Sequence, residues 1–431
     1  MSGLSLEDFA DVIARPDPAF ERAAQERRQR LEPPPTALGQ VGELGEWLAA
    51  VQGQCPTRPL RNIKVLLFAG DHGVARLGVS AREPGGTVRL VRAVLDGAAP
   101  VSVLARHLDV PVRVVDVAVD CDPAELPDEV TRHRVRRGSG QVDVEDALTQ
   151  DEAERAVRVG MAIADQEADA GTDLVVLGDL SVGGTTVAGV LTAVLCGTDA
   201  SVVTGRGSGI DDLAWMRKCA AIRDALRRAR PVAGDPLRLL ATSGGADIAA
   251  MVGFLAQCAV RRTPVVLDGV VSAACALVVQ RIAFRAPDWW RAGHSSGEPA
   301  QAKALDRLTL EPLVDHRIAY GEGTGALLAV PLLRAAAALL AELPERPDAG
   351  AADGADTDPG DAADGPPHAT EAVTGTDTGT EADTEADAAA ETAAETGTPA
   401  GTDTKDSQGG TGPSAPGGTD GPTSPEQPGK G

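Results

Sequence analysis

Uninterrupted runs of apolar residues recur along the chain and predict buried β-strands. A strand with one face in water alternates apolar and polar residues, whereas a strand covered by helices on both faces is apolar throughout. Runs of the second kind occupy residues 64–70, 111–119, 173–179, 237–245 and 264–269. The pattern therefore predicts strands over these five ranges.

Stretches rich in Ala and Leu separate these runs and have the periodicity of helices. They occupy residues 87–107, 151–170, 185–196, 247–260 and 271–284, and a last helix is expected over roughly 325–342. Because strands and helices alternate along the chain, the sequence predicts an α/β fold with a doubly wound parallel sheet.

The first part of the chain has a different, purely helical pattern. Helical periodicity runs from about residue 4 to residue 52 and is broken by the Pro-rich segment EPPP at 32–35. The helix after this break contains the apolar residues Leu44, Trp47 and Leu48. We expect these helices to form an accessory piece beside the sheet.

The C-terminal segment differs sharply in composition from the rest of the chain. The 431 residues include 63 acidic and 40 basic residues, a net charge of −23, and the acidic excess is concentrated after residue 347. From Asp348 onward the chain has no Leu, Ile, Phe, Met, Tyr or Trp, and its one Val is Val373. Such a segment cannot bury enough apolar surface to offset its conformational entropy, so we expect 348–431 to be a disordered acidic tail.

The net charge, the N-terminal residues and the longest apolar stretch argue against several classes of protein. A broad attraction to nucleic acid or to acidic membranes requires positive charge, which this chain lacks. Glu7 and Asp8 stand where a signal peptide would be apolar, and the apolar stretch near 326–343 is broken by Pro331 and Arg334. We therefore expect a cytoplasmic protein that neither spans a membrane nor binds nucleic acid.

The cysteines and histidines do not predict a metal site. The six cysteines are scattered without a CxxC spacing, as expected for reduced thiols in the cytoplasm. They are Cys55, Cys121, Cys196, Cys219, Cys258 and Cys275. The chain has no HExxH motif, and its six histidines lie far apart in the sequence. We expect neither a metal nor another cofactor.

Glycine and polar residues follow nearly every predicted strand. They are Asp71 and His72, then Asp179, then Gly244 and Gly245, and last Asp268. Ligands of open parallel sheets bind at the carboxyl ends of the strands, where glycine lets backbone N–H groups approach an anion. The sequence therefore predicts a pocket at this edge, although each loop alone is also explained as a tight turn between strand and helix.

Motifs of common nucleotide-binding and hydrolytic enzymes are absent or misplaced. There is no GxxxxGK[ST] motif, and the glycines at 205–209 and 321–325 lack the spacing of a dinucleotide-binding fingerprint. A GxSxG match at 293–297 would make Ser295 the nucleophile of a serine hydrolase. The preceding residues, RAPDWWRA, do not predict the strand that such a nucleophile elbow needs, so this function is disfavoured.

Glu322 is the residue whose setting most suggests acid–base chemistry. It stands between Gly321 and Gly323, just before the last predicted helix. Its carboxylate would be unhindered, and the positive end of the helix dipole would favour its ionised, proton-accepting form. The alternative is that Glu322 only stabilises the first turn of that helix.

Eight motifs occur in an order that resembles one enzyme family. They are AGDHGVARLGVSA (69–81), DGAAPVSVLAR (96–106), GDLSVGGTT (178–186), GRGSGIDD (205–212), SGGADIAAMVG (243–253), VVLDGVVSAA (265–274), GHSSGEP (293–299) and YGEGTGA (320–326). Together they resemble the nicotinate-nucleotide–dimethylbenzimidazole phosphoribosyltransferase family over about residues 18–342.

This resemblance implies a fold, a reaction and an assembly. The implied fold is a Rossmann-like domain with a small helical domain, so that residues 1–60 would supply the N-terminal helices of the small domain, 61–325 the α/β phosphoribosyltransferase domain and 326–347 a C-terminal helix. The implied reaction transfers phosphoribose from nicotinate mononucleotide to 5,6-dimethylbenzimidazole, giving nicotinate and an α-ribotide for the lower ligand of cobalamin. The implied assembly is a homodimer.

The resemblance also implies roles for individual residues. Glu322 occupies the position of the family's general base. Contacts to the phosphate and ribose are expected from Gly183, Gly184, Thr185, Thr186, Gly205, Gly207, Ser208, Gly209 and Lys218. The base pocket is expected to include Ser80, Arg89, Leu180 and Tyr320. Supporting loops are expected at Asp71, His72, Asp179, Gly244, Gly245, Asp268 and Ser296.

Several positions depart from the family pattern and keep alternatives open. Where the family usually has GEMGIGNTT, this chain has Asp179, Leu180, Ser181 and Gly184 in place of Glu, Met, Gly and Asn. Arg89, Ala319 and Tyr320 stand where Gln, Arg and Leu are common. The alternatives are a transferase for a different benzimidazole-type base and a catalytically idle nucleotide-binding paralogue.

Overall fold

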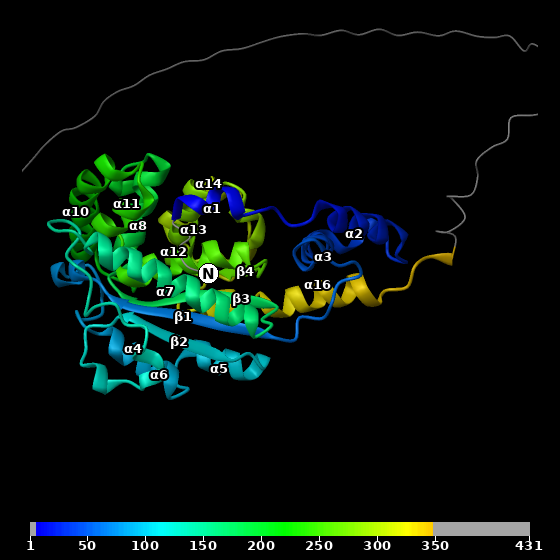
Figure 1. Cartoon of the computed structure of the whole chain (residues 1–431), viewed down its shortest axis with the longest axis horizontal. Coiled ribbons are helices and arrows are strands. Elements are labelled where there is room, and N and C mark those ends of the chain that lie inside the picture. The colour runs from blue at the N-terminus through cyan, green and yellow to red at the C-terminus, as the bar shows by residue number, and fades with distance from the viewer. Residues whose placement is uncertain (1–5, 348–431) are drawn as a thin grey trace, which may run out of the picture. The chain divides into compact units, whose positions relative to one another are not determined.

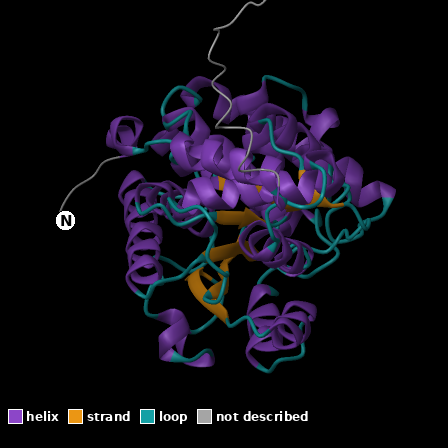
Figure 2. Ribbon diagram, turned by 90° about the vertical axis from the view of Figure 1, so that its right-hand side faces the viewer, coloured by secondary structure: helices purple, strands orange, loops and turns teal. Residues whose placement is uncertain are grey.

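A parallel β-sheet with helices on both faces forms the centre of the protein (Figures 1 and 2). The computed structural model describes residues 6–347. The predicted tail, 348–431, lies outside these described residues. Helices α4, α5 and α6 lie on one face of the sheet, and α7, α12 and α13 lie on the other (Figure 1). The described part of the chain therefore has the layered α/β architecture that the alternating pattern predicts.

The sheet has six strands in the order β2-β1-β3-β4-β5-β6, and every neighbouring pair is parallel. The strands are β1 (Ile63–Asp71), β2 (Val112–Ala118), β3 (Leu174–Val182), β4 (Val265–Leu267), β5 (Trp290–His294) and β6 (Pro312–Val314). The chain winds outward in both directions from β1 and β3, so the predicted doubly wound sheet is confirmed. The loops after β1 and β3 therefore diverge and leave a crevice at the carboxyl edge.

Three strand predictions were wrong or missing. Residues predicted as a strand at 237–245 instead form helix α11 (Pro236–Ser243). The side chain of Asp235 accepts a hydrogen bond from the Arg238 N–H at 3.0 Å, and Pro236 occupies the first turn. Such a cap and an N-terminal proline start a helix whatever the apolar run that follows. Strands β5 and β6, near and at the edge of the sheet, were missed because they are short and carry few large apolar residues.

Four long helices match predicted ranges: α7 (Gln150–Asp169), α8 (Gly184–Cys196), α12 (Ala246–Val260) and α13 (Gly269–Ile282). Two further helices, α10 (Asp212–Ala229) and α14 (Pro299–Leu308), were not predicted. Two predicted helices are each divided in the structure. The predicted helix 87–107 is two helices, α4 (Thr87–Leu95) and α5 (Pro100–Leu108), because Gly97 adopts a φ of 73° and Pro100 starts a new helix. The predicted helix 325–342 is likewise divided into α15 (Thr324–Leu327) and α16 (Val330–Glu342).

Short elements complete the chain. The remaining α-helices are α1 (Phe9–Val12), α2 (Pro18–Arg30), α3 (Gly39–Gln52), α6 (Asp128–Thr131) and α9 (Ala200–Val203). The 3-10 turns are η1 (Leu6–Asp8), η2 (Pro35–Leu38), η3 (Gly73–Leu77), η4 (Pro123–Glu125), η5 (Arg230–Val232) and η6 (Ala286–Trp289).

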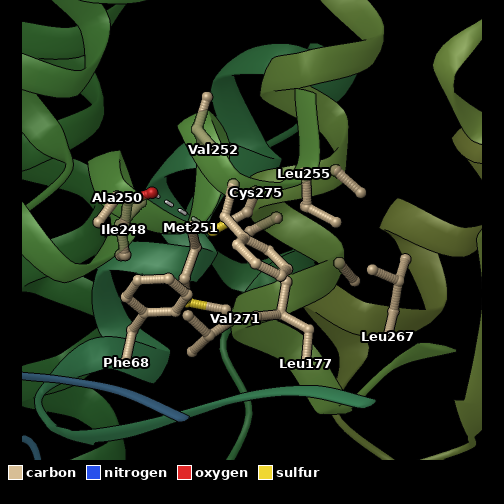
Figure 3. Packing of buried hydrophobic residues seen from close by; sticks show 14 of the residues in the cluster. Phe68, Leu177, Ile248, Ala250, Met251, Val252, Leu255, Leu267, Val271 and Cys275 are labelled. Carbon is tan, nitrogen blue, oxygen red and sulfur yellow. Dashed lines mark hydrogen bonds between the residues drawn. The ribbon is translucent and has the colours of Figure 1, made fainter. Parts of the chain in front are cut away.

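The main hydrophobic core lies between the sheet and helices α12 and α13 (Figure 3). Phe68 of β1 and Phe254 of α12 are fully buried and meet edge to face, with ring centroids 5.7 Å apart. Burial of one such side chain stabilises the fold by about 1.5–3 kcal/mol. Helix α12 packs backbone to backbone on α7, since a Cβ at Gly160 would lie 1.8 Å from the Ala250 carbonyl oxygen. The site-bearing strand ends therefore rest on a rigid layer.

Helices α2, α3 and α16 pack together beside the sheet (Figure 1). The Arg27 guanidinium of α2 donates to the carbonyl oxygens of Leu340, Ala341 and Leu343 at 2.7–3.2 Å and so satisfies the end of α16. Helix α1, before this group, contacts α12, and its Phe9 and the following Ile13 are buried.

One described segment, Thr324–Glu342, is long and apolar enough to cross a membrane by length and composition. About half of it, 56%, is buried inside the protein. Leu333 and Ala336 of α16 are among the buried residues. Core helices of proteins without a membrane span meet the same criteria, so the segment is explained by its packing.

Candidate active site

A cavity opens at the carboxyl edge of the sheet, where the doubly wound topology places a ligand site. Its walls come from the loops after β1, β3, β4 and β5, from the segment 207–208, and from the loop 319–322 that precedes α15. Elements far apart in the sequence thus converge on one hollow, as the glycine-rich strand ends predict.

Asp268 fixes the loop that carries Glu322 through hydrogen bonds. Asp268 follows β4, and its carboxylate accepts the N–H groups of Gly323 and Ala326, both at 2.8 Å. Burial raises the pKa of Asp268, while His294, whose Nδ1 lies 3.4 Å away, and the backbone N–H groups act in the opposite direction. Glu322 itself has a φ of 63°, a conformation that non-glycine residues rarely adopt. The loop is therefore a constrained structure that presents Glu322 to the cavity.

Both carboxylate oxygens of Glu322 have partners. Arg82 Nη1 donates to Oε1 at 2.7 Å, and the Tyr320 hydroxyl donates to Oε2 at 3.1 Å. Arg82 also donates to the Tyr320 oxygen at 3.4 Å. Glu322 is buried, with 9% of its surface exposed, so these interactions are largely shielded from water. The carboxylate is thus held in one orientation on the cavity wall.

A second carboxylate, Asp179, lies on the same wall. Burial raises the pKa of Asp179 to about 7, and the nearby negative charges of Asp247, Asp268 and Glu322 add to the rise. The Ser181 hydroxyl donates to Asp179 Oδ2 at 2.5 Å and opposes it. Several carboxylates sharing one poorly solvated site cannot all be ionised at low cost. Asp179 is therefore a group that can hold or release a proton near neutral pH.

Behind this wall lies a buried pair, His72 and Asp247. His72 Nε2 is 3.1 Å from Asp247 Oδ2, and both side chains are fully buried. Burial is the largest influence on the pKa of His72 and lowers it, but the charge and hydrogen bond of Asp247 together with the charges of Asp71 and Asp179 bring the net pKa above its ordinary value. A Cβ at Gly183 would lie 3.1 Å from His72 Cβ, so this pair supports the loop after β3 directly.

The loops expected to hold a phosphate also line the cavity. Gly183 is the N-cap of α8 and has a φ of 94°, and the Gly207 N–H donates to Glu298 Oε1 at 2.8 Å. Lys218 is buried beneath them, with its Nζ 3.0 Å from Thr185 Oγ1, and burial lowers the pKa of this lysine. N–H groups at a helix start, backed by a cation, suit an anion.

Ten of the residues expected in the site line the cavity. They are Ser80, Asp179, Gly183, Thr185, Gly207, Ser208, Asp268, Ser296, Tyr320 and Glu322. Others stand behind these walls or in the adjoining loops: Asp71, His72, Gly184, Thr186, Gly205, Gly209, Lys218, Gly244 and Gly245. The Asp71 carboxylate accepts from Thr87 Oγ1 at 2.7 Å and from the Asp120 N–H at 2.8 Å, which suits a supporting role.

Two residues expected in the base pocket do not line the cavity. The Arg89 side chain is 63% exposed on α4 and pairs with Glu83 at 3.4 Å. It lies on the outer face of its helix, where a guanidinium stays hydrated. Leu180 is fully buried, because successive residues of β3 point to opposite faces and Asp179 and Ser181 take the side toward the cavity.

Sequence reasoning missed several residues of the site, three of them charged. Arg82 and Glu298 line the cavity, and Asp247 pairs with His72 behind it. Glu298 and Asp247 lie inside two of the eight family-like motifs, and Arg82 lies two residues after Ser80. Their places in or near these motifs could have singled them out. Their partners could not be inferred, because each contact joins segments far apart in the chain.

The GxSxG segment follows a strand, contrary to the prediction. Strand β5 ends at His294, and α14 begins at Pro299. Ser295 nevertheless does not form a nucleophile elbow: its N–H donates to the Val314 carbonyl at 2.9 Å, and no hydrogen bond among residues 6–347 joins its hydroxyl to a histidine. The arrangement that activates a serine is thus missing from the described residues.

Comparisons with known proteins agree with this geometry. A family model described as phosphoribosyltransferase matches residues 13–351. The chain is 70% identical over 345 residues to the nicotinate-nucleotide–dimethylbenzimidazole phosphoribosyltransferase of Streptomyces avermitilis, covering 80% of this chain and 92% of that protein. It is 67% identical over 349 residues to the protein of the same name from Streptomyces coelicolor, covering 81% and 98%. The crystal structure of CobT from Thermus thermophilus matches with a TM-score of 0.72 and 38% identity, over 77% of this chain and 99% of that one.

Proposed function

This chain belongs to the nicotinate-nucleotide–dimethylbenzimidazole phosphoribosyltransferase family, and we propose that it transfers phosphoribose from nicotinate mononucleotide to 5,6-dimethylbenzimidazole. The products are nicotinate and α-ribazole 5′-phosphate, for the lower ligand of cobalamin. The observation that carries the proposal is the placement of Glu322 on a constrained loop in a cavity that is also lined by the glycine and threonine residues at the start of α8.

The reaction needs one proton acceptor and a binding site that holds nicotinate mononucleotide, the phosphoribose donor. The imine-type nitrogen of the benzimidazole attacks C1′ of the ribose with its lone pair. The bond from C1′ to the pyridinium nitrogen breaks, and its electron pair returns to nicotinate, which leaves as a neutral ring. The proton on the other benzimidazole nitrogen passes to Glu322, which acts as general base. Attack from the face opposite the leaving group inverts C1′ and gives the α-ribotide.

The residues at the start of α8 and in the segment 207–208 supply the site for nicotinate mononucleotide in this proposal. The N–H groups at the start of α8 and the hydroxyls of Thr185 and Ser208 would hold the phosphate and ribose. Lys218 would add positive charge from beneath without direct exposure to solvent. Asp179, with its pKa near 7, also lines the cavity and would contact the ribose or the acceptor ring.

The acceptor wall favours a second candidate substrate for the same transferase. Ser80, Arg82 and Tyr320 are polar residues of the lining, beside the apolar Val270, Val271 and Ala319. A phenol and a guanidinium lose hydrogen bonds when they face only methyl groups. A benzimidazole with an unsubstituted or hydroxylated edge is therefore the alternative acceptor.

The direct test is to incubate the purified chain with nicotinate mononucleotide and 5,6-dimethylbenzimidazole and to measure released nicotinate and ribotide. Benzimidazole and 5-hydroxybenzimidazole in the same assay decide the preferred acceptor. A catalytically idle paralogue would bind the nucleotide without releasing nicotinate from any of the three mixtures.

We further propose a cytoplasmic homodimer. All six cysteines are free, as in a reducing compartment. Leu213 and Met216 of α10 are 67% and 61% exposed, and Val202 of α9 is 50% exposed. Exposed apolar side chains gathered on adjacent helices suit an interface with a second copy. Light scattering on the purified chain measures the mass and tests the dimer.

A further inference from the structure

The two oxygens of Glu322 are held by donors of different strength. Arg82 comes from the loop after β1, and its charged guanidinium donates to Oε1 at 2.7 Å. Tyr320 comes from the same loop as Glu322, and its neutral hydroxyl donates to Oε2 at 3.1 Å. Charge-assisted hydrogen bonds are shorter and roughly twice as strong as neutral ones. The carboxylate therefore has one firmly held oxygen and one that is more easily released.

The surroundings of Arg82 keep it on the carboxylate. Its side chain is 30% exposed and lies 5.9 Å, from Cζ to the ring centroid, over Tyr320. Burial lowers the pKa of Arg82, but the hydrogen bond and charge of Glu322 raise it more, so the guanidinium stays charged. Tyr320 is 36% exposed and lines the cavity. The phenol is thus the partner that an incoming ligand displaces at lower cost.

We propose that Arg82 is a positioning residue that reserves Glu322 Oε1 for itself and leaves Oε2 as the oxygen that takes the acceptor's proton. This inference rests on the proposed function. The ring N–H of the acceptor replaces the Tyr320 hydroxyl at Oε2, while Arg82 stays on Oε1 and fixes the direction of the carboxylate. The proton then moves from the ring nitrogen to Oε2 as the other ring nitrogen bonds to C1′ and nicotinate leaves with its electron pair.

The two donors therefore have opposite effects on the reaction. Removing the guanidinium lets the carboxylate rotate away from the acceptor, and a misplaced reacting group loses rate even where binding is kept. Removing the phenolic hydroxyl frees Oε2, so that the acceptor no longer competes with an internal donor. A merely structural role for both residues would instead make both variants worse in parallel.

The experiment compares Arg82→Met, Arg82→Lys and Tyr320→Phe with the unmodified chain, using nicotinate mononucleotide and 5,6-dimethylbenzimidazole varied separately. For Arg82→Met we expect kcat to fall about 10- to 100-fold, with KM for nicotinate mononucleotide within about twofold. Arg82→Lys recovers part of the loss, because an ammonium also donates to Oε1. For Tyr320→Phe we expect kcat/KM for the acceptor to rise about 2- to 10-fold, the worth of one neutral hydrogen bond.

Arg89→Met is the matched control, because it removes the same charge from a nearby surface position that pairs with Glu83 outside the cavity. The melting temperatures of all variants show whether a loss of rate comes from a destabilised fold or from a misplaced Glu322 carboxylate. An unchanged or higher kcat in Arg82→Met, or a fall in acceptor kcat/KM in Tyr320→Phe, overturns the inference. If the unmodified chain itself releases no nicotinate, the proposed function fails instead, and the two failures are distinguishable.

Discussion

Asp268 accepts the backbone N–H of Gly323 at 2.8 Å and thereby links the end of β4 to the loop that carries Glu322. The same carboxylate also accepts the Ala326 N–H, so one side chain satisfies two groups at the start of α15. The position of the general base in the proposed reaction is therefore set by a residue that is distant in the sequence.

Replacing Asp268 with Asn is expected to lower both stability and turnover. An amide can present only one oxygen, and its NH2 group would face one of the two N–H donors. We expect a loss of about 1–3 kcal/mol in the free energy of unfolding and a fall in kcat, measured by urea denaturation and by nicotinate release.

Asp173→Asn is the matched control for this change. Asp173 also accepts two backbone N–H groups, those of Arg61 and Asn62 at 3.0 and 2.8 Å, but it precedes β3 at the opposite edge of the sheet. The Asp173→Asn variant should be less stable than the unmodified chain but keep its turnover. Equal losses of turnover in the two variants would contradict the role of Asp268 in placing Glu322.

Glu322→Gln is expected to bind nicotinate mononucleotide nearly as well as the unmodified chain but to turn over about 10²- to 10⁴-fold more slowly, the usual range for a removed general base. The amide keeps the size of the side chain and cannot take a proton. Calorimetry measures binding, and nicotinate release measures turnover. Turnover equal to that of the unmodified chain at neutral pH would show that another group removes the proton.

Asp179 is expected to make the stability of the protein depend on pH. Its pKa of about 7 lies above the ordinary value of 3.8, so the folded protein keeps a proton that the unfolded chain has lost. This stabilising contribution is complete below pH 3.8 and is lost as the pH rises toward 7.

Asp179→Asn removes that dependence, because the amide stays neutral at every pH. We expect its free energy of unfolding, relative to the unmodified chain, to be higher at pH 8 than at pH 5 by on the order of 1–3 kcal/mol. Urea denaturation at the two pH values measures the difference. A difference that does not change with pH would mean that Asp179 is ionised throughout this range.

His72→Leu is expected to destabilise the fold by about 3–5 kcal/mol, because it leaves the buried Asp247 carboxylate without its partner. The double variant His72→Leu, Asp247→Leu should recover part of the loss, since it buries no unpaired charge. His107→Leu on the exposed face of α5 is the control and should stay within about 0.5 kcal/mol. A double variant no more stable than His72→Leu would argue against a coupled pair.

Local sequence was sufficient for much of the sheet and for the place of the cavity. Strands β1, β2, β3 and β4 were recognisable because a strand covered on both faces must be apolar at nearly every position. The polar residues at their ends marked the carboxyl edge, and the glycines around Glu322 singled out that residue. The apolar run at 237–245 wrongly predicted a strand. The N-cap Asp235 and Pro236 in the first turn start a helix there instead.

The composition and patterning of the chain by themselves determined the α/β class, the doubly wound sheet and Glu322 as a candidate base, because these depend on which residues are apolar and on their spacing. Only the tertiary structure decided that Arg82 faces Glu322 while Arg89 points to solvent. The physical reason is that Arg82 and Glu322 are 240 residues apart, and their contact depends on the parallel sheet, which brings the loop after β1 and the loop before α15 to the same edge. Spacing along a chain carries no information about such distances, so the partners of the Glu322 carboxylate had to be seen in the fold.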